Sequence, residues 1–289
     1  MSVVSVLPFE LWHEILRLAC EPSDFSNLSL AKYLWIDTRE ARKRHERASD
    51  RRMANARLLS QVCRTWRAIA LPLSYTEIRL RSTSYFAFQR LRVAHRWFPN
   101  LFDETRRFVV QNLWLRRPDD VRALLQIMPR LEWLEIETDP TVPAPLRASL
   151  ARILQGQSAL LYLDLRPSAG CNHPVPIELA SLSLIAPLVP QLRRLSCTLK
   201  LPTSPHTQTD EAPNFPCLQV LRITTIIVGP GDQQWVPASF SRWSLPALRQ
   251  LYIPSQWEYY LELLDRGVGA QLKVFVMVCL FQSFLQLVG

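Results

Sequence analysis

The sequence predicts an α/β protein, in which a small helical module precedes an array of units that each contain one strand and one helix. Three observations predict this class. The 289 residues include 47 leucines and 22 prolines, which is typical of many short apolar elements separated by breaks. A short leucine-containing phrase recurs in the second half of the chain. Two segments of the first half carry apolar residues at helical spacing.

Glycine and histidine content exclude several classes of enzyme. Only 7 glycines occur and none precedes Gly156, so no phosphate-binding glycine loop and no G-x-S-x-G nucleophile motif can be written. The 5 histidines are scattered along the chain. We therefore expect no catalytic residues, no cofactor and no enzymatic activity.

The net charge of +9 is concentrated in the first half of the chain. Residues 1–130 carry 23 Lys and Arg against 13 acids, whereas residues 131–289 carry 11 against 12. Eight of the basic residues lie between Arg39 and Arg57, where they could attract phosphates or an acidic surface. The segment matches no nucleic-acid module, so a solvated helical face is the preferred interpretation and nucleic-acid binding is not expected.

Cysteine spacing and the chain ends bear on compartment. The 6 cysteines form no C-x-x-C pair, and Cys171 with His173 lacks the second ligand pair of a zinc site, so no metal is expected. Pro8 and Glu10 interrupt any signal-peptide core, which favours a cytoplasmic or nuclear location. The apolar stretch 275–289 is shorter than the ~20 residues of a membrane span. We expect a terminal strand and a packed cap there, and no membrane partner.

The two front segments predict amphipathic helices. The first spans residues 7–20, with Pro8 in its first turn and Glu10 near its positive dipole end. Its apolar residues are expected on one face: Leu11, Trp12, Ile15, Leu16 and Ala19. The second helix is expected over residues 58–70 and should stop at Pro72.

The residue types in these two helices resemble a known family. The chain reads L-P-x-E-L from Leu7 and V-C-R-x-W-R-x-I-A from Val62, followed by a strand-like segment at 75–80. In this order near an N-terminus, the two motifs resemble the F-box. This three-helix module docks on the Skp-type adaptor of a cullin-RING ubiquitin ligase. The resemblance implies these adaptor-docking residues: Leu7, Pro8, Leu11, Ile15, Leu16, Val62, Cys63 and Trp66.

The sequence departs from the F-box in spacing. F-box helices are usually joined by short loops, whereas a basic insertion at 21–57 separates the two halves here. The middle helix is expected near residues 27–36.

The recurring phrase of the second half has the form P-x-L-x-x-L-x-[IL]. Its leading leucines lie 29, 32, 26, 30 and 24 residues apart, and they are Leu131, Leu160, Leu192, Leu218, Leu248 and Leu272. The spacing resembles that of leucine-rich repeats, which implies stacked strands over a common core. The usual laddering Asn or Cys is absent, so the solenoid should be irregular. Helical returns are expected at 118–128, 145–155, 176–189 and 257–266.

Residues between the repeat leucines should face away from the core, onto the concave surface where solenoids usually bind proteins. The candidate target-binding residues are Trp133, Glu135, Tyr162, Asp164, Arg194, Arg222 and Tyr252. The first strands contribute acids and the later ones arginines, so the surface should be negative at one end and positive at the other.

The expected organisation has four parts. An F-box-like domain at 5–80 is followed by a connecting segment at 81–105, a leucine-rich-repeat-like domain at 106–278 and an apolar tail at 279–289. The preferred hypothesis is a substrate-recognition adaptor of a Skp/cullin/F-box-type ubiquitin ligase. Its partners would be a Skp-type adaptor, through it a cullin, and an unidentified target protein. A protein-interaction scaffold without ubiquitin chemistry is the alternative, and a basic nucleic-acid-associated protein ranks below it.

Overall fold

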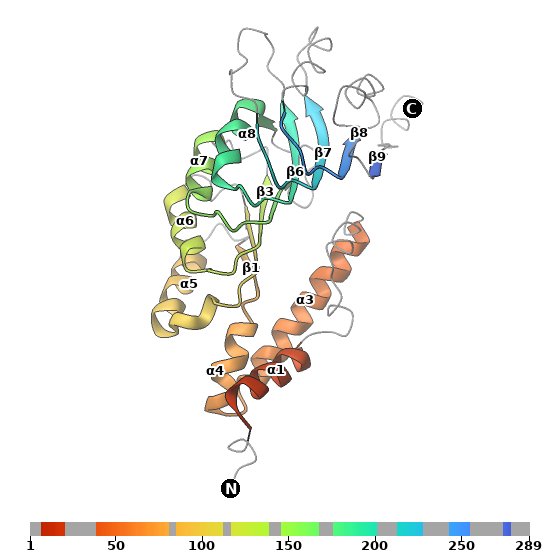
Figure 1. The fold of residues 1–289 in the computed structure, drawn as a ribbon. Helices are drawn as coiled ribbons and strands as arrows, with labels where there is room; N and C mark the ends of the chain where they lie inside the picture. The colour runs from red at the N-terminus through yellow and green to blue at the C-terminus, as the bar shows by residue number, and fades with distance from the viewer. Residues whose placement is uncertain are drawn as a thin grey trace, which may run out of the picture. The chain divides into compact units, whose positions relative to one another are not determined.

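The computed structural model is α/β with a parallel sheet (Figure 1). The structure describes residues 7–20, 39–80, 85–111, 117–138, 146–167, 176–200, 213–227, 243–254 and 274–278. The chain divides into two compact units. Unit 1 comprises Met1–Arg79, Tyr85–Arg107 and Ile127–Arg130. Unit 2 comprises Leu80–Ser84, Phe108–Gln126 and Leu131–Gly289.

Three helices of unit 1 pack on one another. They are α1 (Phe9–Cys20), α3 (Arg39–Leu59) and α4 (Arg64–Leu73). Each contributes to one buried apolar cluster, which is completed by the partly buried Leu59 and Trp66. The expected first helix is confirmed, because α1 covers most of residues 7–20.

The expected helix over residues 58–70 is wrong at both ends. Leu58 and Leu59 belong to the last turn of α3, and the backbone breaks between Ser60 and Cys63. Helix α4 begins after Cys63 and runs through Pro72 to Leu73. A proline in the last turn removes only one backbone donor, so it does not stop the helix at once.

The basic segment is an integral part of the helical unit. Residues 39–57, expected within an insertion, form most of α3, and Ala56 of this helix is fully buried in the cluster. Apolar residues at its C-terminal end therefore anchor an otherwise polar helix to α1 and α4. The middle helix expected near residues 27–36 lies outside the described residues.

The segment expected to connect the domains contains regular structure. Helix α5 (Tyr85–Trp97) and the 3-10 helix η2 (Pro99–Phe102) pack on each other and group with unit 1. Strands β1 (Glu77–Leu80) and β2 (Arg107–Gln111) flank them in the sequence.

The sheet has the strand order β1-β2-β3-β4-β6-β7-β8-β9, with the short β5 paired to β6. Each pairing from β3 onward is parallel. These strands are β3 (Trp133–Thr138), β4 (Tyr162–Pro167), β5 (Ile177–Glu178), β6 (Arg194–Lys200), β7 (Val220–Ile227), β8 (Gln250–Pro254) and β9 (Val274–Val278).

Each copy of the recurring phrase forms one strand, and the copies are aligned in register. Leu134 pairs with Leu163, Leu163 with Leu195, and Leu195 with Leu221. The row continues through Leu251 to Phe275. Its members from Leu134 to Leu221 are buried. The spacing of the leading leucines along the sequence is therefore the number of residues from one strand to the equivalent position of the next phrase-bearing strand.

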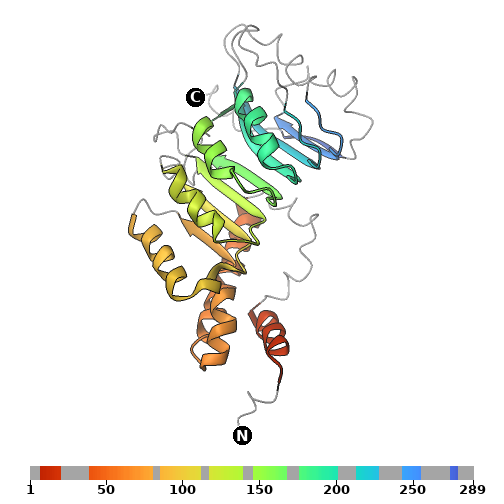
Figure 2. The same ribbon diagram turned by 60° about the vertical axis from the view of Figure 1, so that its left-hand side comes forward.

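Helices α6 (Pro118–Gln126), α7 (Leu146–Leu154) and α8 (Leu179–Ile185) lie side by side along one face of the sheet (Figures 1 and 2). Three of the expected helical returns are thus confirmed. The return expected at 176–189 contains both α8 and the 3-10 helix η4 (Ala186–Leu188). The return expected at 257–266 and the tail at 279–289 lie outside the described residues.

Candidate docking surface

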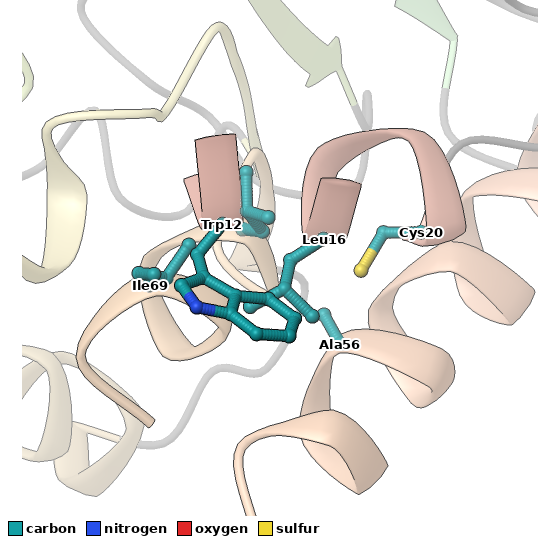
Figure 3. Packing of buried hydrophobic residues seen from close by; sticks show 6 residues of the cluster. Trp12, Leu16, Cys20, Ala56 and Ile69 are labelled. Atoms are coloured by element: carbon teal, nitrogen blue, oxygen red, sulfur yellow. The ribbon is translucent and has the colours of Figure 1, made fainter. Parts of the chain in front are cut away.

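Helix α1 has a buried side that holds unit 1 together. Its Trp12, Leu16 and Cys20 recur every four residues and point toward Ala56 of α3 and Ile69 of α4 (Figure 3). The Trp12 ring lies 5.3 Å from that of Trp66, at an interplanar angle of 51°. The carbonyl of Pro8 accepts hydrogen bonds from the backbone N–H groups of residues 11 and 12, so Pro8 lies immediately before the first turn of α1.

The opposite side of α1 is also apolar, and it is exposed. Leu11 is 50% exposed, Ile15 45% and Leu18 54%, at intervals of four and three residues that place them on one line of the helix. Leu7 and Phe9 are exposed just before and at the start of this helix. Helix α1 therefore carries two apolar sides, of which unit 1 covers one. We call the exposed residues Leu7, Leu11, Ile15 and Leu18 the α1 row.

The last turn of α3 and the turn that follows it add two further exposed apolar side chains, Leu58 and Val62. Hydrogen bonds hold this turn: Ser60 Oγ donates to the carbonyl of Arg57 at 2.7 Å, and Arg67 Nε donates to the carbonyl of Ser60 at 3.2 Å. The Cys63 Sγ accepts from the backbone N–H of Trp66 at 3.5 Å, so Cys63 is the N-cap of α4.

The eight predicted docking residues occupy different environments. Leu7, Pro8, Leu11, Ile15 and Val62 are exposed, and Cys63 and Trp66 are partly buried. Leu16 is only 1% exposed, so it is a core residue that cannot contact a partner while the unit is folded. The helical spacing predicted Leu11 and Leu16 on one apolar face. The apolar residues of α1 cover a wider part of its circumference than the core does, so Leu16 is buried and Leu11 is exposed.

Exposed apolar side chains are concentrated in unit 1. Among the described residues, twelve large apolar side chains are exposed, and eleven of them belong to this unit. The remaining one is Leu184 of α8. Contiguous exposed apolar surface is typical of protein-interaction sites, whereas scattered single residues are ordinary.

Charged groups beside the α1 row pair within their own helix. Arg17 donates to both carboxylate oxygens of Glu14, at 2.9 and 2.6 Å, and this hydrogen bond lowers the pKa of Glu14. A partner that covers Leu11 and Ile15 would therefore meet an ion pair at the edge of the apolar row.

A buried carboxylate that sequence reasoning missed joins α3 to the strands that follow it. Glu77 accepts from Ser49 Oγ at 2.8 Å, from Arg79 Nε at 2.7 Å and from an Arg107 terminal nitrogen at 3.0 Å. Two of these partners, Ser49 and Arg107, lie 28 and 30 residues away in the sequence, so no local pattern could have revealed the whole cluster.

The candidate target-binding residues lie on the sheet as expected from strand alternation, but most are buried. Trp133, Glu135, Tyr162, Asp164 and Arg194 are buried, whereas Arg222 and Tyr252 are partly buried. The expectation that the whole row faces solvent is therefore wrong for strands β3, β4 and β6. Their role in target binding stays a prediction.

Ion pairing accounts for the burial of the acids in this row. A terminal nitrogen of Arg166 lies 2.5 Å from Glu135 and 2.8 Å from Asp164. Beside them, the Trp133 and Tyr162 rings are 5.7 Å apart. Arg166 was not among the candidate residues. It lies two residues beyond Asp164 on β4 and so faces the same side, which is a signal that the sequence did contain.

Burial also shifts pKa values on the sheet. Desolvation raises the pKa of the Cys197 thiol to about 12, with a smaller contribution from the charge of Asp164. Desolvation lowers the pKa of Arg222. Because ionisation of this thiol is so unfavourable, Cys197 is not an activated nucleophile.

Within the part of the chain that the structure describes, no three His, Cys, Asp or Glu residues gather as a metal site. Cys171 and His173 lie outside that part. None of the helices described is long and apolar enough to cross a membrane.

Comparisons with protein-family models, with curated proteins and with solved structures find no match to this chain.

Proposed function

We propose that this chain is a substrate-recognition adaptor of a Skp/cullin/F-box-type ubiquitin ligase. In this proposal the α1 row and the α3–α4 turn bind a Skp-type adaptor, and the parallel strands of unit 2 bind the target protein. Unit 1 corresponds to the F-box-like module and unit 2 to an irregular leucine-rich-repeat solenoid. The chain performs no chemistry itself, because the ligase supplies the reactive cysteine and the target supplies the lysine.

One observation carries the proposal: α1 presents apolar residues on the side that its own unit does not cover. Leu11 and Ile15 come from the same motif as the buried Trp12 and Leu16, so one short helix both forms a core and leaves an apolar row open. Burying a leucine or isoleucine side chain is worth roughly 1.5–3 kcal/mol. A few such residues are therefore enough to anchor a partner.

The aligned strands support the second half of the proposal. The in-register leucine rows build a core shared by successive strands, which leaves the other side chains of each strand on the opposite face. Arg222 and Tyr252 are the candidate residues that remain partly accessible there. We therefore place the target contact on β7 and β8 rather than on β3 and β4.

The adaptor contact is tested by co-expression of the full chain with a Skp-type adaptor. Leu11→Glu and Ile15→Glu should each abolish co-purification, because each replaces an exposed apolar side chain with a charge at the contact. Together the lost apolar contacts correspond to a loss of about 100-fold or more in affinity. Thermal unfolding should be unchanged, since both side chains lie outside the core.

Leu184→Glu is the matched control, because Leu184 has the same 45% exposure as Ile15 but belongs to unit 2. It should leave co-purification intact. The proposal is contradicted if the wild-type chain does not bind the adaptor, or if Leu184→Glu weakens binding as much as Ile15→Glu.

Ubiquitin transfer separates the ligase adaptor from the plain interaction scaffold. A reconstituted cullin-RING ligase containing the full chain should modify proteins that the chain binds, and Ile15→Glu should prevent this. A chain that binds its partners but never supports transfer would be a scaffold. Arg222→Ala and Tyr252→Ala should weaken target binding without affecting the adaptor contact.

A further inference from the structure

Helix α5 packs on η2 through one side only. Phe88 is fully buried, and the His95 ring stacks on Phe102 with centroids 5.9 Å apart. Leu91 is partly buried on the same side. These residues recur at three- and four-residue steps and account for the attachment of α5 within unit 1.

The other side of α5 carries an exposed row that the proposed adaptor contact does not use. Phe86, Arg90, Val93 and Trp97 follow one another at intervals of four, three and four residues, which places them on one line of the helix. Trp97 is 77% exposed and Phe86 76%, the highest values among the exposed large apolar side chains of the described residues. We call these four residues the α5 row.

Charge along α5 indicates what kind of partner fits the row. The helix sequence YFAFQRLRVAHRW contains no acidic residue. Arg90 lies within the row, and Arg96 is exposed beside it. Arg92 is exposed on the side of Phe88 instead. The guanidinium carbon of Arg92 lies 5.8 Å from the centroid of the Phe88 ring, which holds this arginine close to its own helix. The surface combines aromatic anchors with the positive charge of Arg90 and Arg96.

The width of the row favours a protein helix over a lipid surface. Phe86, Val93 and Trp97 form a narrow line, as in helix-on-helix contacts, whereas membrane-bound helices bury a broad apolar face. Arg90 lies along this line, so insertion into lipid would also bury its charge. In a contact with a protein helix, an Asp or Glu of the partner can pair with the Arg90 guanidinium.

We propose that the α5 row is a second docking surface, and that it binds an acidic amphipathic segment of another protein. The segment presents apolar residues at helical spacing to Phe86, Val93 and Trp97, and Asp or Glu to Arg90 and Arg96. This mode is a helix packed along a helix. The proposal does not depend on adaptor binding through the α1 row.

The test selects binders to the full-length chain from a displayed library of random 20-residue peptides. The enriched peptides should carry net negative charge and apolar residues at i, i+3 or i+4, and i+7. Trp97→Ala should weaken binding of a synthesised representative at least about tenfold. The double substitution Arg90→Glu and Arg96→Glu should weaken binding of the same peptide. It should strengthen binding of a second peptide in which lysines replace the acidic residues.

Leu184→Ala is the control and should leave peptide binding unchanged, as should Leu11→Glu, which separates this surface from the α1 row. Vesicles of neutral lipid with about one third phosphatidylserine test the competing occupant. The proposal is overturned if no acidic peptide is enriched or if Trp97→Ala binds as tightly as the wild type. It is equally overturned if vesicles bind through Trp97 while the selected peptides do not.

Discussion

Leu11 and Leu16 are the same residue type on the same helix, yet their environments are opposite. Leu16 is 1% exposed between three helices, whereas Leu11 is half-exposed on the other side of α1. At the scale of single residues, buried and exposed side chains therefore occupy nearby positions of one short helix. The residues that anchor the unit are distinct from those available to a partner.

This separation predicts different costs for the same substitution. Leu16→Ala should lower the free energy of unfolding of unit 1 by about 2–5 kcal/mol, because it leaves a cavity in a packed cluster. Leu11→Ala should change it by no more than about 0.5 kcal/mol. Chemical denaturation followed by circular dichroism measures both. Equal costs at the two positions would contradict the assignment of buried and exposed sides.

Cys197 gives the sheet a pH-dependent stability. The pKa of this thiol is about 12 in the folded chain, above its value of about 8.5 in an unfolded peptide. As pH rises above about 9, the unfolded thiol loses its proton while the folded one keeps it, so folding weakens. At pH values between these two pKa values, the thiol should contribute a loss of stability that approaches about 1.4 kcal/mol per pH unit.

The measurement compares urea unfolding of the wild type and Cys197→Ala from pH 7 to 10. The variant starts less stable, but its stability should decline less steeply above pH 9. Parallel pH profiles would show that Cys197 ionises normally in the folded state.

At the scale of elements, the chain breaks between α3 and α4 at a place where the local sequence pattern is helical. Residues 58–70 have continuous helical periodicity, and the sequence alone predicts one helix. The structure instead uses Cys63 as an N-cap and turns the chain at Ser60 and Gln61. Cysteine is an uncommon N-cap, so the usual Ser, Thr, Asp or Asn signal for a helix start was missing.

The cap leads to a prediction about α4. Cys63→Ser should retain the capping hydrogen bond to the backbone N–H of Trp66, whereas Cys63→Ala removes it. The alanine variant should be less stable than the serine variant by about 1 kcal/mol. Thermal unfolding of the two variants decides this, and equal midpoints would mean that the thiol does not cap the helix.

The Glu77 cluster makes a prediction about how α3 is held to the strands. Glu77→Gln removes the negative charge that faces Arg79 and the buried Arg107, and it should destabilise unit 1 by about 3 kcal/mol. Glu14→Gln is the control, because the Glu14–Arg17 pair is exposed and should leave the unfolding midpoint unchanged. Similar effects of the two substitutions would contradict a structural role for Glu77.

At the scale of the whole molecule, the two units differ in where their apolar side chains lie. Unit 1 carries nearly all of the exposed apolar side chains among the described residues, whereas the cores of unit 2 are formed by rows of aligned leucines. Unit 1 can expose apolar side chains without losing its core, because the core is formed by other side chains of the same helices. Unit 2 gains stability from contacts between neighbouring parallel strands.

Substitution in the leucine row should therefore affect unit 2 alone. Leu195→Ala removes a fully buried side chain between β4 and β7 and should cost about 2–5 kcal/mol. Hydrogen exchange should accelerate in the flanking strands, while protection of α1 stays unchanged. Equal loss of protection in α1 would show that the units unfold together.

The sequence by itself determined the α/β class, the position of α1 and the strands that carry the recurring phrase, because these depend on local periodicity and on a phrase that recurs at strand-to-strand spacing. Those strands are β3, β4, β6, β7, β8 and β9, whereas the short β5 was not predicted. Only the tertiary structure decided that Leu16 is core while Leu11 is open, that α5 presents Phe86 and Trp97 outward, and that Arg166 allows Glu135 to be buried. The physical reason is that burial depends on neighbours distant in the chain. Local spacing specifies which residues share a face, and packing decides which of the available faces is covered.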